Sequence, residues 1–220
     1  MTTRRQERGQ DTRRRIVDVA LVLFREHGYD GTTMRMIAGE AGISLGNAYY
    51  YFAGKDDLIL ELYAQLHAAH TARADEVLSL ERGLEERLRG VVRAWVDEAA
   101  PYKEFAGTFF RHAADPNSPL SPFSQQSGPV RDSAIALYGR VLAGAKIAPL
   151  LADDLPELLW LYAMGIVLFW VHDASPETVK TYALIDRSTP LVIKLVNLTR
   201  LRLLSSAVED IRALLAEISG

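Results

Sequence analysis

The sequence predicts an all-α protein, and three observations support this prediction. Apolar residues recur at the helical spacing of about 3.6 residues, as in Ile16, Val19, Ala20, Leu23 and Phe24. Alternation of apolar and polar residues, the pattern of a half-buried strand, is nearly absent. The chain has 220 residues, of which 49% are apolar, so it can build a sizeable helical core.

Two helices are expected near the N-terminus. The first contains residues 16–24, with Asp11-Thr12 as its N-terminal cap and Gly28 at its end. The second runs from Met34 to Ala41, and Thr33 is its expected N-cap.

A tight turn and a third helix follow. Gly42 is expected in the left-handed conformation, and Ser44 is expected to cap the next helix. That helix runs from Leu45 to about Phe52, and Ala53-Gly54 breaks it.

The remaining helices are longer. One begins near Lys55-Asp56 and runs to about Leu80, and Pro190 is expected to kink or divide a later one. Pro101 suits a first helical position. Residues 114–129 contain four prolines and four serines, so a long loop is expected there. The further helices are predicted at Leu84–Glu98, Pro101–His112, Val130–Ala148, Asp154–His172, Pro176–Leu204 and Ala207–Ile218.

Composition excludes several classes of protein. The sequence has no cysteine, which rules out disulfides, thiolate metal sites and a cysteine nucleophile, and suits a reducing cytoplasm. Its first 15 residues are charged and lack the apolar core of a secretory signal. The longest apolar run, 14 residues from Leu158 to Val171, is short for a membrane span. We therefore expect a cytoplasmic protein without membrane contact.

Charge is spread unevenly along the chain. Residues 1–55 carry nine Lys/Arg and six Asp/Glu, whereas residues 56–220 carry 16 and 22. A basic N-terminal part on an acidic remainder suggests an anionic partner. Ordinary solvated surface charge would explain so small a difference equally well.

The second and third helices have the spacing of a helix-turn-helix, whose second helix lies in the DNA major groove. Ala48 and Phe52, four apart, are expected to face inward. Leu45, Gly46 and Asn47 are then expected on or near the opposite side. There, leucine suits a thymine methyl, glycine permits close approach of the backbone, and asparagine suits an adenine or a phosphate.

Three consecutive tyrosines lie in this helix and point in different directions, about 100° apart. Tyr49 and Tyr50 are expected to give their hydroxyls to DNA phosphates, and Tyr51 to be partly buried. Thr33 and Lys55, each at a helix N-terminus, would add backbone N–H groups or charge toward phosphates. The alternative is that the exposed tyrosines serve packing or a protein interface.

The segment FREHGYDGTTMRMIAGEAGISLGNAYYYFAGKDDLILELY resembles the N-terminal domain of tetracycline-repressor-like (TetR-type) regulators. The resemblance covers about residues 11–63, with Tyr51 where the family often has histidine. It implies a homodimer on a palindromic double-stranded DNA operator, and a repressor released by a small molecule. Implied DNA contacts are Thr33, Arg35, Ser44, Leu45, Gly46, Asn47, Tyr49, Tyr50 and Lys55.

The implied domains are a DNA-binding domain at residues 1–55 and an effector-binding and dimerisation domain at residues 56–220. In the first, Arg4, Arg5 and Arg8 form either a flexible arm that follows the minor groove or phosphates, or a merely solubilising tail.

Subunit contact is expected through residues 158–171, which are apolar on every side and must be covered all round. The helix from Pro176 is the expected companion, giving a four-helix bundle with two helices from each subunit. A monomeric core around one central helix is the alternative. Gly165, in the middle of this apolar helix, suggests close approach by another helix, from the second subunit or from the Thr178–Leu204 helix. A locally tight contact inside one subunit is the alternative.

Aromatic residues of the middle helices are the candidates for a pocket that takes a largely apolar effector. They are Trp95, Phe105, Phe109, His112, Tyr138 and Tyr162, and each is equally explained as an ordinary core aromatic.

Enzymatic and metal-dependent functions find little support. The five histidines are dispersed and no Glu-x-x-His motif occurs on paired helices. His67 and His70 are a possible metal pair or part of a solvated helix face, and they lack a clear third ligand. We expect no cofactor, no metal and no catalytic residues. The competing functions are an α-helical enzyme and an interaction module without DNA binding.

Overall fold

The structure is a computed structural model that describes residues 2–81 and 83–198, without the side chains of residues 2–7, 105 and 150. Within these residues it consists of α-helices and three short 3-10 helices and contains no strand, which confirms the all-α prediction. Two compact units divide the chain. We call Met1–Leu66 with Pro101–Val130 the head unit, and His67–Ala100 with Arg131–Gly220 the body unit.

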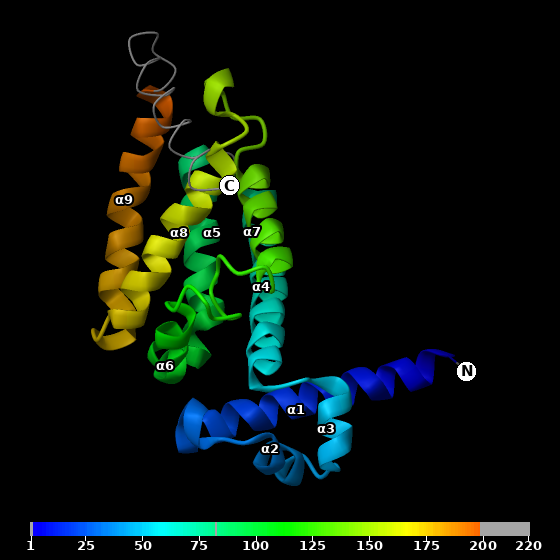
Figure 1. Cartoon of the computed structure of the whole chain (residues 1–220). Helices are drawn as coiled ribbons and strands as arrows, with labels where there is room; N and C mark the ends of the chain where they lie inside the picture. Colours follow the sequence, from blue (N-terminus) through cyan, green and yellow to red (C-terminus); the bar gives the residue numbers. More distant parts are fainter. Residues whose placement is uncertain (1, 82, 199–220) are drawn as a thin grey trace. The chain divides into compact units, whose positions relative to one another are not determined.

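The head unit contains α1 (Thr2–Gly31), α2 (Met34–Glu40), α3 (Leu45–Tyr51), the start of α4 (Lys55–Leu80), and α6 (Lys103–Ala113) (Figure 1). Side chains from all of these helices meet in one apolar core. The functional boundary expected at residue 55 stays a prediction, since the head unit as a compact body also includes α6 and the loop after it.

Helix α1 begins at Thr2, so the expected N-terminal cap at residues 11–12 is wrong. The Thr12 hydroxyl instead donates 2.9 Å to the Arg8 carbonyl, the i−4 bond that threonine makes inside a helix. Arginine, glutamine and glutamate before it are good helix formers, so the helix extends. The flexible arm expected for Arg4, Arg5 and Arg8 is therefore a helix, in which the side chains of residues 4 and 5 lie outside the described part.

The body unit contains α5 (Leu84–Ala99), α8 (Leu155–His172), α9 (Val179–Leu198), and most of α4 and of α7 (Gly128–Val141). Helix α7 ends seven residues before the expected Ala148, because Gly144 with φ 75° redirects the chain. Three 3-10 helices connect these elements: Ala100–Tyr102, Pro149–Leu151 and Pro176–Thr178.

Prolines behave differently from the prediction at two places. Pro101 lies in a 3-10 helix rather than at the first position of α6. Pro190 lies inside α9, which is not divided there and continues to Leu198. The missing proline N–H removes only the bond to the carbonyl of residue 186, and packing of α9 on α5 and α8 sustains the helix. The expected helix end at Leu204 and the helix 207–218 lie outside the described residues.

Helix α8 is apolar on every side, as expected. By length and composition alone it could cross a membrane, with a mean hydropathy of 1.5. One face is a core face that packs on α5 and α9, with Leu155, Leu159, Trp160, Ala163, Ile166 and Trp170 buried. The Trp170 ring meets the Trp95 ring of α5 edge to face at 5.4 Å.

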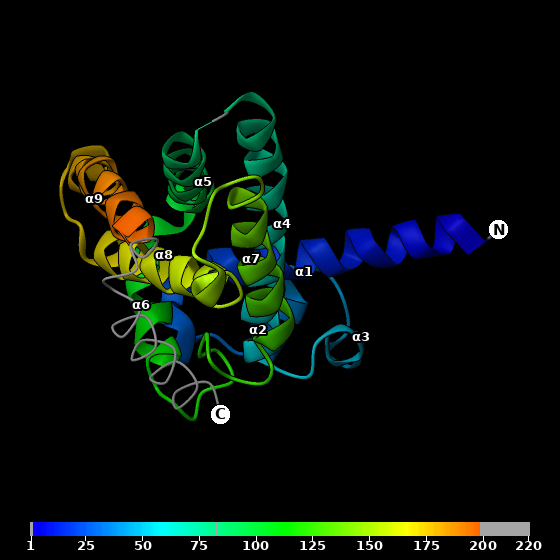
Figure 2. The same ribbon diagram turned by 90° about the horizontal axis from the view of Figure 1, so that it is seen from above.

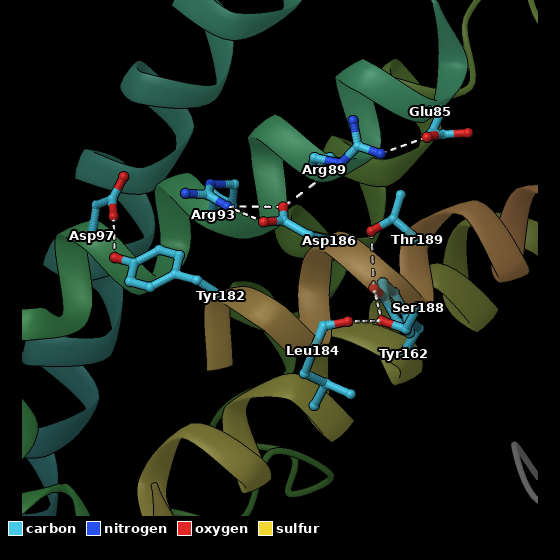
Figure 3. A network of polar contacts seen from close by, with 10 residues as sticks. All are labelled: Glu85, Arg89, Arg93, Asp97, Tyr162, Tyr182, Leu184, Asp186, Ser188 and Thr189. Atoms are coloured by element: carbon cyan, nitrogen blue, oxygen red, sulfur yellow. Dashed lines mark hydrogen bonds and ion pairs between the residues drawn. The ribbon is translucent and has the colours of Figure 1, made fainter. Parts of the chain in front are cut away.

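A polar network fixes α9 against α5 and α8 (Figure 3). Arg93 of α5 donates to both carboxylate oxygens of Asp186 at 2.8 and 2.9 Å and lies over the Tyr182 ring. On the α8 side, the Tyr162 hydroxyl is hydrogen-bonded to Ser188 at 2.8 Å and to Thr189 at 3.1 Å. These contacts set the rotation of α9 and decide which of its faces remains uncovered.

Asp173 closes the turn between α8 and α9. Its carboxylate accepts the backbone N–H and hydroxyl of Ser175 and those of the fully buried Thr181. Burial alone would raise the pKa of Asp173, but these four hydrogen bonds lower it well below its usual range. The carboxylate therefore stays ionised and holds the start of α9.

His67 and His70 link α4 to its neighbours. His70 is buried, and its Nε2–H donates to the Val91 carbonyl at 2.9 Å. His67 Nε2 lies 2.8 Å from the Ser133 hydroxyl of α7. The prediction that His70 belongs to a solvated helix face is therefore wrong. The described residues contain no group of three His, Asp or Glu that could hold a metal ion.

We predict that His70 makes stability depend on pH. Burial lowers the pKa of His70 from 6.5 to about 4, so the folded protein favours the neutral ring. Its contribution is fully present above the unfolded pKa of 6.5 and is lost as pH falls toward 4, because the unfolded chain then binds the extra proton. The loss should reach up to about 3 kcal/mol in the free energy of unfolding.

The matched variant is His70→Gln, whose amide can keep the donor to Val91 but does not titrate. Urea denaturation between pH 7 and pH 4 should show a smaller loss of stability in His70→Gln than in wild type. Parallel curves for the two proteins would contradict the prediction.

Candidate nucleic-acid interface

The turn between α2 and α3 has the predicted chemistry. Gly42 has φ 65°, which only glycine adopts without strain, and the Ile43 N–H donates back to the Ala38 carbonyl at 3.0 Å. Ser44 is the N-cap of α3 and its hydroxyl accepts the Asn47 N–H at 3.1 Å. These bonds set the angle between the two helices of the helix-turn-helix.

Cap and glycine predictions for α2 and α1 are also confirmed. Thr33 is the N-cap of α2, and its hydroxyl accepts the Met36 N–H at 3.3 Å. Gly28 takes a positive φ of 74° near the end of α1. The hydroxyl of Thr33 keeps its own proton as a donor, and the side chains of Thr33 and Arg35 are both exposed.

Helix α3 is anchored by one face. Ala48 and Phe52 are buried at 0% and 1% exposure, as predicted. Leu45, expected on or near the opposite side, is half-buried against the head core, because positions 45, 48 and 52 share one stripe at spacings of three and four. Gly46 and Asn47 are exposed.

The three tyrosines divide as expected. Tyr49 and Tyr50 are 50% and 81% exposed, and Tyr51 is partly buried against the head core. The rings of Tyr50 and Tyr51 meet edge to face at 5.2 Å. Two neighbouring exposed aromatic residues on a seven-residue helix leave their hydroxyls available to an external acceptor.

Arg13 supports α3 from α1, a role that the sequence analysis missed. Its guanidinium donates to Glu61 of α4 at 2.7 and 2.9 Å and to the Tyr51 carbonyl at 3.2 Å. It also lies over the Phe52 ring, 4.4 Å from the centroid. Burial would raise the pKa of Glu61, but its bonds from Arg13 and Gln65 lower it.

Tyr29 and Lys55 join α1 to α4. The Lys55 ammonium donates 2.6 Å to the Tyr29 carbonyl and lies 4.4 Å from the centre of its ring. The Tyr29 hydroxyl donates to Asp56, and burial together with this bond raises the pKa of Tyr29 above its ordinary range. Lys55, predicted as a DNA contact, therefore has a structural role in the head core as well.

An open pocket of about 580 Å³ lies between α1 and α3. Its lining residues are Arg8, Gly9, Thr12, Asn47, Tyr50 and Tyr51. None of the six is acidic, and two of the predicted DNA contacts are among them. We call the part of α1 before Asp11 its N-terminal extension. The pocket places Arg8 of this extension next to the exposed flank of α3.

The six aromatic candidates for an effector pocket do not belong to one unit. Phe109 is buried in the head core, where its ring meets those of Phe24 and Tyr29, and the His112 ring lies 4.7 Å from Tyr29. Trp95, Tyr138 and Tyr162 belong to the body unit. The side chain of Phe105 lies outside the described part.

Comparison with known families adds to this geometry. Residues 16–62 match a family described as bacterial regulatory proteins, tetR family. Residues 87–214, more than half of the chain, match a family described as tetracyclin repressor-like, C-terminal domain. The two matches follow each other along the sequence.

Curated relatives match over part of their length. The helix-turn-helix-type transcriptional regulator AcrR of Shigella flexneri is 38% identical over 63 residues, which are 29% of each chain. The transcriptional repressor AcnR of Corynebacterium glutamicum is 37% identical over 82 residues, 37% of this chain and 41% of that protein. The match thus spans less than half the length of these relatives.

The fold also recurs in solved structures. The transcriptional regulator FadR from Bacillus subtilis, whose crystal structure is a complex with stearoyl-CoA, superposes with a TM-score of 0.64. The match covers 80% of this chain and 95% of that one, at 20% sequence identity. Similarity at this level of identity establishes the shared fold.

Proposed function

The chain belongs to the tetracycline-repressor-like family of bacterial regulators, and from this premise we propose that it is a ligand-controlled transcriptional repressor. It binds a palindromic DNA operator as a homodimer and leaves it when a small molecule binds the body unit. Because its DNA partner lies in the cytoplasm, so does the protein.

The exposed flank of α3 carries this proposal. Gly46, Asn47, Tyr49 and Tyr50 face outward from a helix whose other face is locked into the head core. A helix anchored in this way can enter the major groove as a rigid element. The neighbouring Thr33 and Arg35 of the α2 region supply exposed groups for phosphate oxygens.

The competing functions make different demands. An enzyme would need a cluster of catalytic groups, whereas the matched relatives are transcriptional regulators. An interaction module without DNA binding would explain the exposed tyrosines, but not their position on the second helix of a helix-turn-helix. A duplex selected from random DNA by the purified protein separates the proposals, since only the regulator enriches one sequence.

The dimer is proposed to form through the apolar face of α8 and α9, two helices that lie side by side (Figures 1 and 2). The exposed apolar residues of this face are Leu168, Phe169, Leu191, Leu195 and Leu198. The network with α5 uses Tyr182 and Asp186 of α9 (Figure 3), whereas these five residues are exposed. A second copy of the same face would cover them as a four-helix bundle.

The effector is proposed to be largely apolar. Aromatic and aliphatic residues dominate the buried parts of the body unit. The similar FadR structure holds stearoyl-CoA, so fatty acyl-CoA is the first class to test. An acyl chain suits such an interior, and a charged coenzyme part would remain near solvent.

Tyr50→Phe should weaken operator binding by roughly 1 kcal/mol, the value of one net hydrogen bond. The loss should be similar on selected and random duplexes, because a phosphate contact carries no base information. Titration by fluorescence anisotropy measures both. Tyr182→Phe in α9 keeps the ring beneath Arg93 and is the matched control, which should bind DNA like wild type once sedimentation shows the same assembly state as wild type. Unchanged affinity of Tyr50→Phe would remove its assigned role.

Stearoyl-CoA should stabilise the protein and release it from its operator. A ligand at a hundred times its Kd adds about 2.7 kcal/mol to the free energy of unfolding. Thermal unfolding with stearoyl-CoA, with coenzyme A alone and with stearate identifies the part of the molecule that is recognised. No stabilisation and no release by any of the three would exclude acyl-CoA as the effector class.

Gly165→Leu should dissociate the dimer while the subunit stays folded. Among the described residues, and apart from the backbone of its own helix, a Cβ at Gly165 would meet no heavy atom within 4 Å, and the residue is exposed. The expected close approach of a helix therefore cannot come from α9 of the same chain. If the partner supplies it, overpacking should cost the dimer roughly 1–3 kcal/mol or more.

Sedimentation measures whether the Gly165→Leu protein is still a dimer, and circular dichroism measures whether it is still helical. Operator affinity should fall when the dimer dissociates, because one head unit reads only one half-site. Gly139→Leu in α7 is the control, since a Cβ there also meets nothing within 4 Å. A helical Gly165→Leu protein that remains a dimer would place the interface elsewhere.

A further inference from the structure

The pocket between α1 and α3 has the chemistry of a phosphate site. Arg8 contributes an exposed guanidinium, and Asn47 and Tyr50 contribute an amide and a hydroxyl that can donate. The Thr12 hydroxyl already donates to the Arg8 carbonyl. Thr12 therefore lines the pocket without offering it a hydrogen-bond donor. A single anion would meet one positive charge and no carboxylate among the residues lining the pocket.

The two flanks of α3 differ. Asn47, Tyr50 and Tyr51 share the flank toward α1, at spacings of three and four residues, and all three line the pocket. Tyr49 projects about 100° from Tyr50, on the side away from Tyr51. A helix that lies in the major groove has one sugar–phosphate backbone on each side, so its two flanks face different strands.

We propose that this pocket holds one backbone phosphate of the operator strand that runs along the α1 side of α3. Arg8 is its counter-charge, and Asn47 and Tyr50 are its hydrogen-bond donors. Tyr49 meets the opposite strand. The inference rests on the proposed function and deepens it, because it makes the N-terminal extension of α1 part of the DNA interface and assigns Asn47 to a phosphate rather than to a base.

The helical state of the extension supports the assignment. The N-terminal part of α1 continues past α3 (Figures 1 and 2). A helix holds Arg8 one turn before Thr12 and therefore at a fixed place beside α3. A flexible arm would lose conformational entropy on binding DNA, whereas a preformed helix has already placed its charge.

Gly9 leaves room for a phosphate in the wall of the same pocket. Glycine destabilises the interior of a helix relative to alanine, yet it occurs here in the wall of the pocket. A Cβ at this position would meet nothing within 4 Å, so packing inside the protein does not require glycine. Free space at Gly9 is what a phosphate seated against the helix backbone needs.

The test uses the full-length protein and a duplex that wild type selects from random DNA. Arg8→Gln should bind about tenfold more weakly at 0.1 M salt, and the magnitude of the slope of log K against log salt should fall by about 1.8, which is about 0.9 for the phosphate in each half-site of the dimer. Arg14→Gln is the control, because Arg14 is exposed and, six residues after Arg8, points about 120° away from Arg8 around α1. It should leave the slope nearly unchanged.

Gly9→Leu provides a variant whose effect is not a lost charge. Leucine favours the helix, and the position has free space for its Cβ, so thermal stability should be kept or raised. The side chain would occupy the pocket, so operator affinity should fall as in Arg8→Gln. Normal affinity of a stable Gly9→Leu protein would overturn the inference.

Phosphate ethylation interference locates the contact. In each half-site, wild type should show one phosphate whose ethylation blocks binding, and ethylation at that phosphate should no longer matter in Arg8→Gln. Tyr49→Phe should instead remove the effect of ethylation at a phosphate of the other strand. If wild type binds its selected duplex, two results would overturn the assignment. One is an equal loss of affinity in Arg8→Gln and Arg14→Gln. The other is an Asn47→Ala protein that loses discrimination at one base pair only, which would make Asn47 a base contact. A wild-type protein that selects no duplex would instead refute the proposed function itself.

Discussion

The junction at Tyr29 is the interaction on which the head unit depends. Its ring packs against Phe24 and Phe109, its hydroxyl donates to Asp56, and its carbonyl accepts the Lys55 ammonium. The end of α1, the start of α4 and helix α6 are thereby held at one residue. Each partner alone contributes little, but the three elements cannot shift independently while the Tyr29 side chain stays in place.

Helix α3 needs such a frame because it has seven residues, too few to be a stable helix by itself. Ala48 and Phe52 fix it to the core, and Arg13 fixes its end to α1 and α4. The outward residues can then keep one orientation without contributing to the core. The exposed tyrosines and the pocket beside them are consequences of this anchoring.

In the body unit, polar contacts hold α9 in place while other residues of the same helix stay exposed. Arg93, Asp186 and Tyr182 tie α9 to α5, and Tyr162 ties it to α8. Polar contacts occupy these sides of α9, and Leu191, Leu195 and Leu198 of the same helix are exposed. Exposed apolar residues of this kind are costly in water, and the proposed subunit contact would cover them.

Local sequence patterns were sufficient to predict the all-α class, the helix-turn-helix, the caps at Thr33 and Ser44, and the inward face of α3. These features depend on residues within one or two helical turns, so periodicity and local hydrogen bonding suffice to predict them. The same local rules failed at residues 11–12, where a capping pattern lay inside a longer helix. They also placed Leu45 outward, because one short helix does not reveal how wide its buried stripe is.

Contacts between residues that are distant in sequence could not be predicted from such local patterns. Arg13 and Glu61 are 48 residues apart, and nothing near either of them indicates the other. Phe109 looked like a wall of an effector pocket but lies in the head core, since the packing of α6 on α1 selects its neighbours. Which side chains share a core, a pocket or an ion pair depends on how whole helices pack, and that is a property of the assembled chain rather than of any segment.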